Sequence, residues 1–147
     1  MIVENILGNI KHFDLNGRQI DYVGIEWYEV NKRILKKRSE AGEEVGIRLK
    51  EGLTLRDGDI LWADNGRIIA VDICECDAIC VIPRDMEEMG KVCYEIGNRH
   101  IPLFLNGVEV VIPFDQPIFD LLQKSGLRPV KVRRKLKNIL RCKGHEH

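Results

Sequence analysis

The chain has 147 residues, and 44% of them are hydrophobic, which is enough to build the core of one domain or of two small ones. Its 23 basic and 23 acidic residues cancel, so the overall charge gives no argument for binding nucleic acid or a membrane surface. No hydrophobic run approaches the roughly 20 residues of a membrane-spanning helix. The first residues lack the basic and apolar regions of a secretory signal, so we expect a cytoplasmic protein.

Residues 1–75 are predicted to form a small domain made only of β-strands, a sandwich or a barrel. Short segments rich in β-branched residues alternate here with turn sequences, and none has helical periodicity over a helical length. The expected strands are residues 2–10, 22–30, 32–38, 45–50, 53–55, 60–63 and 67–73. Because these strands carry no cluster of histidines, cysteines and carboxylates, they favour a domain that binds a peptide or a protein partner, or one that is purely structural.

The pattern changes near residue 75, and residues 76–147 are predicted to form a second domain. A strand over residues 78–82 precedes a helix over residues 85–96, in which apolar residues recur at steps of three and four. Two short strands then flank Asn106-Gly107, a strong hairpin signal. A second helix follows from Gln116 to Lys124, with Asp115 as its expected N-cap, and a last strand covers residues 129–135.

This order of strand, helix, strand, strand, helix, strand is ferredoxin-like, a sheet with helices on one face. The whole chain is therefore expected to be α+β, with an all-β domain followed by a ferredoxin-like βαββαβ domain. Gly97 and Asn98 tolerate left-handed backbone angles, so they are expected to end the first helix. His100 would then lie exposed at a junction between a helix and a strand. Both domains are small, and association between chains would help to stabilise them.

The five cysteines are an odd number in a chain without an export signal, so reduced thiols are expected. Cys74 and Cys76 would share one face of a strand, and Cys80 could join them. The spacing differs from the paired Cys-x-x-Cys motifs of zinc ribbons. The cysteines are interpreted as small apolar core residues, with a soft-metal or redox role as the alternative.

Seven basic residues follow Pro129 with no acidic residue until Glu146. They are Lys131, Arg133, Arg134, Lys135, Lys137, Arg141 and Lys143. Such a stretch is interpreted as a solvated face with a terminal tail, or as a nucleic-acid-binding patch. No aromatic residue is interleaved with these charges, which favours the first interpretation.

Imidazole groups are the candidate metal ligands. The spacing of His145 and His147 would let both rings reach one ion in an extended tail, and imidazole suits nickel, zinc and copper. His100 supplies one ring, which does not make a site. In a two-fold dimer with His100 near the axis, each chain would supply the same residue, and a tail histidine would complete the ligand set. His12 is interpreted as a surface residue.

The segment Gly97-Asn98-Arg99-His100, followed by an apolar residue, Pro102 and Leu103, resembles the signature of the UreE family, the urease accessory proteins that carry nickel. Residues 26–35 and 144–147 are also similar to that family. The resemblance implies a homodimer in which His100 binds Ni(II) across the interface and His145 and His147 add ligands, with Zn(II) as a possible substitute. It implies as partners the accessory GTPase UreG and apo-urease with its other accessory proteins.

The chain departs from the family pattern in two places. It has only two histidines in its tail, where some members have a long histidine-rich one, and none at residues 110–115, where some have a second site. No enzyme motif is present, neither a nucleophile elbow, a phosphate-binding glycine loop nor a His-Glu-x-x-His helix. The alternative function is a peptide- or RNA-binding module that uses the β-domain and the basic segment.

Overall fold

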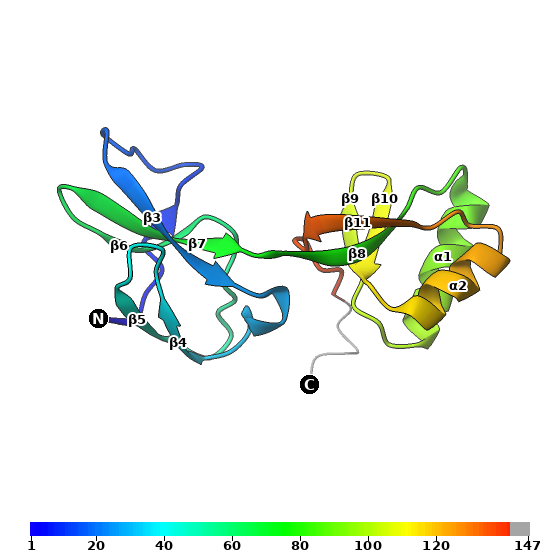
Figure 1. Ribbon diagram of the computed structural model, residues 1–147, viewed down its shortest axis with the longest axis horizontal. Coiled ribbons are helices and arrows are strands. Elements are labelled where there is room, and N and C mark those ends of the chain that lie inside the picture. Colours follow the sequence, from blue (N-terminus) through cyan, green and yellow to red (C-terminus); the bar gives the residue numbers. More distant parts are fainter. Residues whose placement is uncertain (142–147) are drawn as a thin grey trace. The chain divides into compact units, whose positions relative to one another are not determined.

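The computed structural model describes residues 1–141 and divides the chain into two compact units (Figure 1). The first unit ends at Cys74 and the second begins at Glu75. Each unit has its own hydrophobic core, so each is described separately. No helix within residues 1–141 combines the length and the hydrophobicity needed to cross a bilayer.

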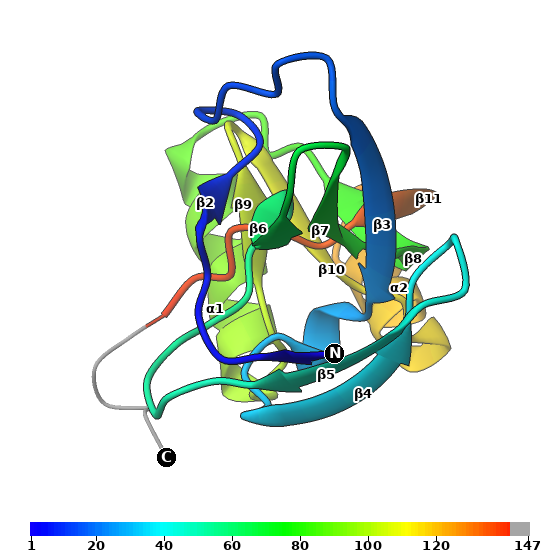
Figure 2. The same ribbon diagram turned by 90° about the vertical axis from the view of Figure 1, so that its left-hand side faces the viewer.

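The first unit is built from two sheets with a core between them. One sheet has the order β1-β5-β4 and the other has the order β2-β6-β7-β3. Figure 2 looks onto this unit and shows β4 and β5 running crosswise to β3. The strands are β1 (Ile2–Val3), β2 (Gly8–Asn9), β3 (Gln19–Ile25), β4 (Ile34–Arg38), β5 (Glu44–Arg48), β6 (Asp59–Ala63) and β7 (Arg67–Ile73).

The core of the first unit draws buried residues from both sheets. Leu35, Val45 and Ile47 come from the smaller sheet, and Val23 and Ile69 come from the larger one. A second cluster, which includes Ile60 and Ile68, covers the other side of β6 and β7. The consecutive residues Ile68 to Val71 are therefore all buried, which explains why β7 is apolar without alternation.

Three expectations for this unit were wrong. Residues 2–10 form two short strands in different sheets, because β1 pairs with β5 and β2 pairs with β6. The strand expected over residues 22–30 ends at Ile25 and is followed by the 3-10 helix η1 (Trp27–Glu29). The Glu29 carboxylate accepts hydrogen bonds from the Glu26 backbone N–H at 3.0 Å and from Lys37 Nζ at 2.7 Å, which favours the turn over an extended strand. Residues 53–55 form no strand.

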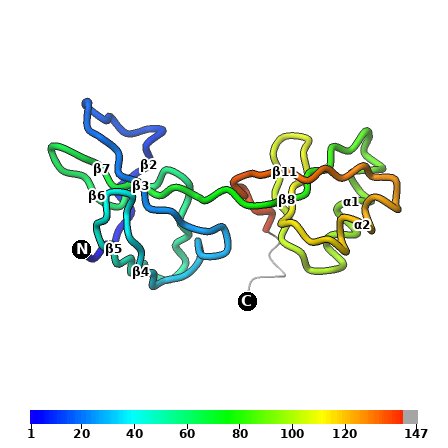
Figure 3. The backbone as a smooth tube through the Cα atoms, viewed as in Figure 1, coloured from blue at the N-terminus to red at the C-terminus, as the bar shows by residue number. Residues whose placement is uncertain are grey.

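The second unit is a four-stranded antiparallel sheet with two helices on one face, as Figures 1 and 3 show. Its strand order, β11-β8-β10-β9, confirms the predicted ferredoxin-like topology. The elements are β8 (Glu75–Val81), α1 (Met86–Asn98), β9 (Phe104–Asn106), β10 (Glu109–Pro113), α2 (Gln116–Lys124) and β11 (Val130–Lys135). The core lies between the helices and the sheet and includes Ile79, Val92, Ile96, Ile112 and Leu122.

Local signals set the helix starts. The Asp85 side chain accepts a hydrogen bond from the backbone N–H of Glu88 at 2.8 Å, and Asp115 accepts one from Ile118 at 3.4 Å. Both aspartates are therefore N-caps. The hairpin between β9 and β10 turns at Gly107, whose φ of 60° is left-handed, as its asparagine-glycine sequence predicts.

Candidate metal centre at the end of helix α1

His100 is exposed and lies just beyond the end of α1, in a helix-ending Schellman motif. Its own backbone N–H donates to Gly97 O at 3.1 Å, and the next N–H, of Ile101, donates to Ile96 O at 3.3 Å. Ile101 also packs against the core cluster that contains Ile96. In this motif the residue after the C-cap adopts a left-handed conformation, and His100 has a φ of 56°.

Helix α2 ends in the same motif and allows a direct comparison. Gly126 N–H donates to Gln123 O, and Leu127 N–H donates to Leu122 O, both at 3.0 Å. The left-handed residue of α2 is Gly126, with a φ of 77°, which is the usual residue for this position. The same turn therefore carries a glycine in one helix and a histidine in the other.

Helix α1 ends at Asn98, two residues later than expected, and the left-handed residue is His100, not Gly97 or Asn98. A left-handed conformation costs a residue with a Cβ roughly 1–2 kcal/mol relative to the right-handed one. Four non-glycine residues among residues 1–141 have positive φ, and two of them are asparagines, which tolerate it best. The left-handed conformation of His100 is a reason to test its side chain for a role.

The last described residues return to the segment that follows His100. After β11, Leu136 is buried, and Ile139 then forms an antiparallel bridge with Phe104 of β9. Leu140 N–H donates to Leu103 O at 2.8 Å. Strands β11 and β9 are at opposite edges of the sheet, so the chain changes edges between residues 135 and 139. Residue 140 thus lies beside Leu103, three positions from His100 in sequence.

Of the predicted ligand set, the structure describes only His100. His145 and His147 lie outside the described residues, as does Cys142, whose thiolate could compete with these histidines as a metal donor. Within residues 1–141, no group of three histidine, cysteine, aspartate or glutamate side chains is arranged to hold a metal ion. A complete site at His100 therefore needs ligands from residues 142–147 or from another chain.

Several acidic side chains of the second unit have other partners. Glu95 pairs with Arg99 at 2.6 Å, one turn along α1, and Asp115 caps α2. The Glu109 carboxylate accepts hydrogen bonds from Arg134 Nη1 at 2.7 Å and Nη2 at 2.8 Å. Arg134, with a weaker contribution from Cys80, lowers the Glu109 pKa to about 2. These carboxylates are engaged in the fold, which favours imidazole over carboxylate ligands.

The cysteines resemble core residues more than reactive thiols. Burial, followed by a hydrogen bond from its thiol to Glu109 at 3.2 Å, raises the pKa of Cys80 to about 11. Burial also raises the pKa of Cys74 and of Cys93. Because the thiolate is the nucleophile and the metal ligand, these shifts disfavour the redox and soft-metal alternatives at those three positions.

The Arg134–Glu109 pair predicts an acid-dependent change that can be measured directly. In an Arg134→Gln protein, the Glu109 pKa is expected to rise from about 2 toward its ordinary value of 4.5. In the parent protein, the pKa of Glu109 is lower in the folded state than in the unfolded state. The stabilisation that the Arg134–Glu109 pair gives the folded protein is therefore present above pH 4.5 and is lost as the pH falls toward 2. Titration of the Glu109 carboxyl carbon by NMR checks this.

Arg133→Gln is the matched control, because Arg133 is on the same strand but pairs with Asp77, at 3.3 Å. It should leave the titration of Glu109 unchanged. If Glu109 titrates at the same pH in the parent and in the Arg134→Gln protein, the assigned pairing is wrong.

The basic residues after Pro129 are partly engaged in the second unit itself. Arg133 pairs with Asp77, Arg134 pairs with Glu109, and Lys131 Nζ lies 4.4 Å from the centre of the Phe114 ring. Because these three cations already have partners within the unit, the structure gives little support to the interpretation of this stretch as a nucleic-acid-binding patch.

Two family models cover almost the whole chain. The N-terminal domain of the UreE urease accessory protein matches residues 3–73, and its C-terminal domain matches residues 75–146. The chain belongs to the UreE family of urease accessory proteins. The resemblance drawn from residues 97–103 is thereby confirmed.

Curated UreE proteins match along most of their length. The Urease accessory protein UreE of Acetivibrio thermocellus is 51% identical over 131 residues, covering 89% of this chain and 86% of that protein. That of Flavobacterium johnsoniae is 47% identical over 148 residues, covering 100% of this chain and 90% of the relative. That of Bacillus sp. (strain TB-90) is 35% identical over 147 residues, covering 100% and 99%.

Sequence reasoning on this UreE-family chain missed two features of the site. One is the left-handed conformation of His100, and the other is the return of residues 136–140 to β9. The second feature had a signal, because Leu136, Ile139 and Leu140 interrupt a basic stretch with apolar residues. Apolar residues in a terminal segment indicate that it packs against the domain.

Proposed function

We propose that this chain binds Ni(II) and delivers it for assembly of the urease active site. Membership of the UreE family supports a role in urease maturation. The observation that carries the metal assignment is His100, which occupies a left-handed position that α2 fills with glycine. Imidazole nitrogen is a suitable donor for nickel and also for zinc, which we expect as a substitute.

The ligand set that we propose is His100 from each chain of a homodimer, with His145 and His147 as auxiliary ligands. One imidazole is too few for a site, and residues 1–141 contain no group of three histidine, cysteine, aspartate or glutamate side chains that could hold a metal ion. A two-fold axis beside His100 would double the ligand count with a single residue type. His145 is five positions after Leu140, and an extended chain of that length spans at most about 18 Å. Leu140, hydrogen-bonded to Leu103, would anchor the tail so that its histidines act beside His100.

A carrier must hold its ion against water and also release it to the next protein. A site with few protein ligands, exposed at a helix end, suits release better than a buried, fully coordinated cage. Catalysis is not required of such a protein, and we propose that any GTP hydrolysis during assembly belongs to the accessory GTPase UreG. The proposed partners are UreG and cytoplasmic apo-urease with its other accessory proteins.

Activation of purified apo-urease tests this proposal. With UreG, the other accessory proteins, GTP and limiting Ni(II), addition of this chain is expected to raise the yield of active urease. The His100→Ala protein should not do so, whereas His12→Ala, which changes an exposed histidine of the first unit, should behave as the parent. Equal activation by the parent and by the His100→Ala protein would contradict delivery through this site.

Deleting residues 144–147 is expected to weaken nickel binding or lower its capacity without affecting folding. Terminal residues rarely contribute to the stability of a domain, and the deletion removes both auxiliary imidazoles. Nickel affinity and the thermal melting curve of the deletion protein check both parts. Cys142→Ser separates the rival thiolate donor. If Cys142→Ser loses nickel while a His145→Ala/His147→Ala protein retains it, the auxiliary ligand is the thiolate.

A further inference from the structure

After β11 the chain crosses from one edge of the second unit's sheet to the other. We call residues 136–140, which make this crossing, the strap. β11 forms one edge of the sheet and β9 forms the other, and the strap ends beside β9, where Ile139 bridges Phe104. Figure 2 shows the strap in red, running from the end of β11 to the side on which β9 lies. The part of the chain after residue 141 therefore starts from the β9 edge.

The strap belongs to the face of the sheet that points away from the helices. Ile79 and Val81 of β8 pack in the core under the helices, so alternation along the strand places Ala78 and Cys80 on the opposite face. Ala78 and Cys80 are nevertheless buried, and so is Leu136 of the strap. Because the helices occupy the other face, the crossing segment contributes to the cover of this one.

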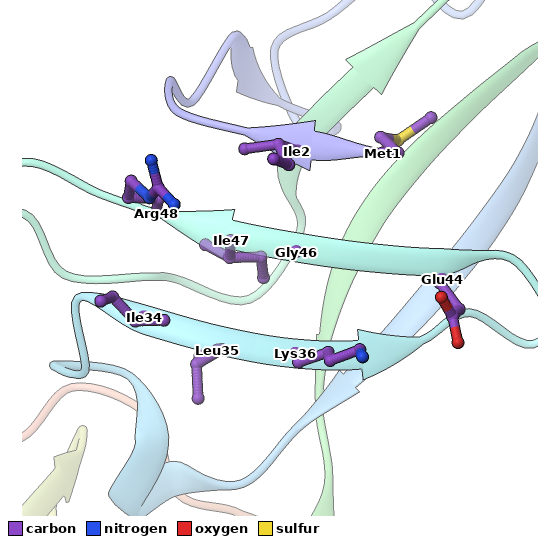
Figure 4. A pocket seen from close by; sticks show the side chains of 9 residues that line it. All are labelled: Met1, Ile2, Ile34, Leu35, Lys36, Glu44, Gly46, Ile47 and Arg48. Carbon is purple, nitrogen blue, oxygen red and sulfur yellow. The ribbon is translucent and has the colours of Figure 1, made fainter.

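The β1-β5-β4 sheet of the first unit shows what a more open face looks like. Ile2 and Ile34, drawn in Figure 4, lie on its outer face and are 65% and 73% exposed. Leu136 is only 4% exposed. The strap is therefore packed as part of the fold of the second unit.

Backbone hydrogen bonds hold the end of the strap on β9. Leu140 N–H donates to Leu103 O at 2.8 Å, and Leu105 N–H donates to Asn138 O at 3.4 Å. The side chain of Leu140 is half exposed, so its backbone N–H makes the better-defined contact. Position 140 is thereby fixed beside Leu103, which follows His100 by three positions.

An ion pair holds the chain just before the strap begins. Arg134 Nη1 and Nη2 donate to the Glu109 carboxylate at 2.7 and 2.8 Å. Asn106 Nδ2 donates to the same carboxylate at 3.0 Å. The end of β11 is therefore tied to the β9–β10 hairpin, and the strap runs between two attached points.

The docked strap shortens the path that the tail histidines must bridge. His145 is five positions after Leu140 and ten after Lys135, the last residue of β11. If the strap came off, the tail would start from β11, three strand spacings or roughly 14 Å from β9. The effective concentration of a tethered group falls as roughly the −3/2 power of tether length, so doubling the tether lowers it about threefold.

We propose that the strap positions the tail for nickel, with the hydrogen bond from Leu140 N–H to Leu103 O setting where the tail begins. This inference rests on the proposed function, in which His145 and His147 are auxiliary ligands. Docking of the strap raises the local concentration of their imidazoles at His100. By reciprocity, an ion held by His100 and the tail stabilises the docked strap by the same factor, so undocking loosens the ion for transfer.

Leu140→Pro tests the strap with a single atom group. Proline removes the N–H that bonds to Leu103 O, whereas Leu140→Ala removes the side chain and keeps the bond. In calorimetric titration with Ni(II), the Leu140→Pro protein should bind at least about threefold more weakly than the parent. The Leu140→Ala protein should bind as the parent does, and circular dichroism of both samples checks the fold.

Amide hydrogen exchange gives the reciprocal measurement. Saturating Ni(II) should slow exchange of the Leu140 amide about threefold in the parent, the same factor by which the strap tightens nickel. In a His145→Ala/His147→Ala protein, Ni(II) should leave this exchange rate unchanged. An exchange rate that Ni(II) does not alter in the parent would overturn the coupling.

Deletion of residues 144–147 separates positioning from damage to the site. In the deleted chain, Leu140→Pro should no longer change nickel affinity, because no tail histidine remains to be positioned. The proposal is overturned if Leu140→Pro weakens binding equally with and without residues 144–147. It is also overturned if the deletion weakens binding but Leu140→Pro does not, a result that leaves the proposed function intact. If the deletion itself leaves affinity unchanged, the auxiliary ligands are wrongly assigned and the role of the strap falls with them.

Discussion

The His100→Ala protein is expected to lose the tight nickel site altogether. Changing residues that only support metal ligands typically costs 10–100-fold in affinity, so losing a ligand from both chains should cost on the order of 100-fold or more. His100 is exposed, so removal of its imidazole should leave the fold in place. Isothermal titration with Ni(II), accompanied by circular dichroism of the same sample, measures both outcomes.

A His100→Gly protein separates the loss of the ligand from any change in the backbone. Glycine adopts the left-handed conformation without a steric cost, as Gly126 does at the end of α2. This variant should also lose tight nickel binding, while its free energy of unfolding stays within about 1 kcal/mol of the parent value. His12→Ala serves as the control for histidine content. Tight nickel binding that persists in both His100 variants would show that another residue is the primary ligand.

The Ile69→Ala protein is expected to be about 2–5 kcal/mol less stable in its first unit, which is the usual cost of truncating a buried isoleucine to alanine. Ile69 is fully buried in the core between the two sheets. Its strand, β7, pairs with β6 on one side and with β3 on the other, so the cavity would lie at the centre of the larger sheet.

Two spectroscopic signals can follow the two units separately. Both tryptophans, Trp27 and Trp62, are in the first unit, and α1 and α2 are in the second. In the Ile69→Ala protein, the fluorescence transition in urea should move to lower concentration, while the helical circular dichroism signal should not move. Ile34→Ala makes the same chemical change at an exposed position and should alter stability by less than about 0.5 kcal/mol. Equal destabilisation by the two changes would contradict the assigned core.

The second unit was predictable from the sequence because its signals are local. Asp85 and Asp115 cap helices that begin one residue later, and Asn106-Gly107 makes the hairpin within a few residues. The helical spacing of Met89, Cys93 and Ile96 identifies the face of α1 that packs on the core. Once these elements were placed, their order alone was enough to give the ferredoxin-like topology.

The first unit was less predictable because its pairings join distant residues. β1 pairs in parallel with β5, and β3 pairs in parallel with β7, whose partner residues lie more than 40 positions away. No local pattern shows that residues 2–10 divide between two sheets. At the turn formed by Trp27–Glu29, the Glu29 carboxylate accepts a hydrogen bond from Lys37 of β4, eight residues further along the chain.

At the candidate site, the backbone conformation of His100 was not predicted from the sequence. The motif around His100 identified a candidate ligand, but Gly97 and Asn98 also appeared suitable as the left-handed residue. His100 adopts the left-handed conformation because Ile96 and Ile101, on either side of the turn, both pack in the core. Their contact fixes the position of the turn. The engagement of Glu109 with Arg134 was also invisible, since the two residues meet only when β10 and β11 flank β8.

The stoichiometry of tight nickel binding tests the central claim most directly. Calorimetric titration of the parent chain with Ni(II), together with its mass by light scattering, gives the number of ions per assembled protein. A shared site at His100 predicts one tight ion for every two chains, a mass of twice 16.9 kDa, and loss of that ion in the His100→Ala protein. One tight ion per single chain, retained after His100→Ala, would contradict the account.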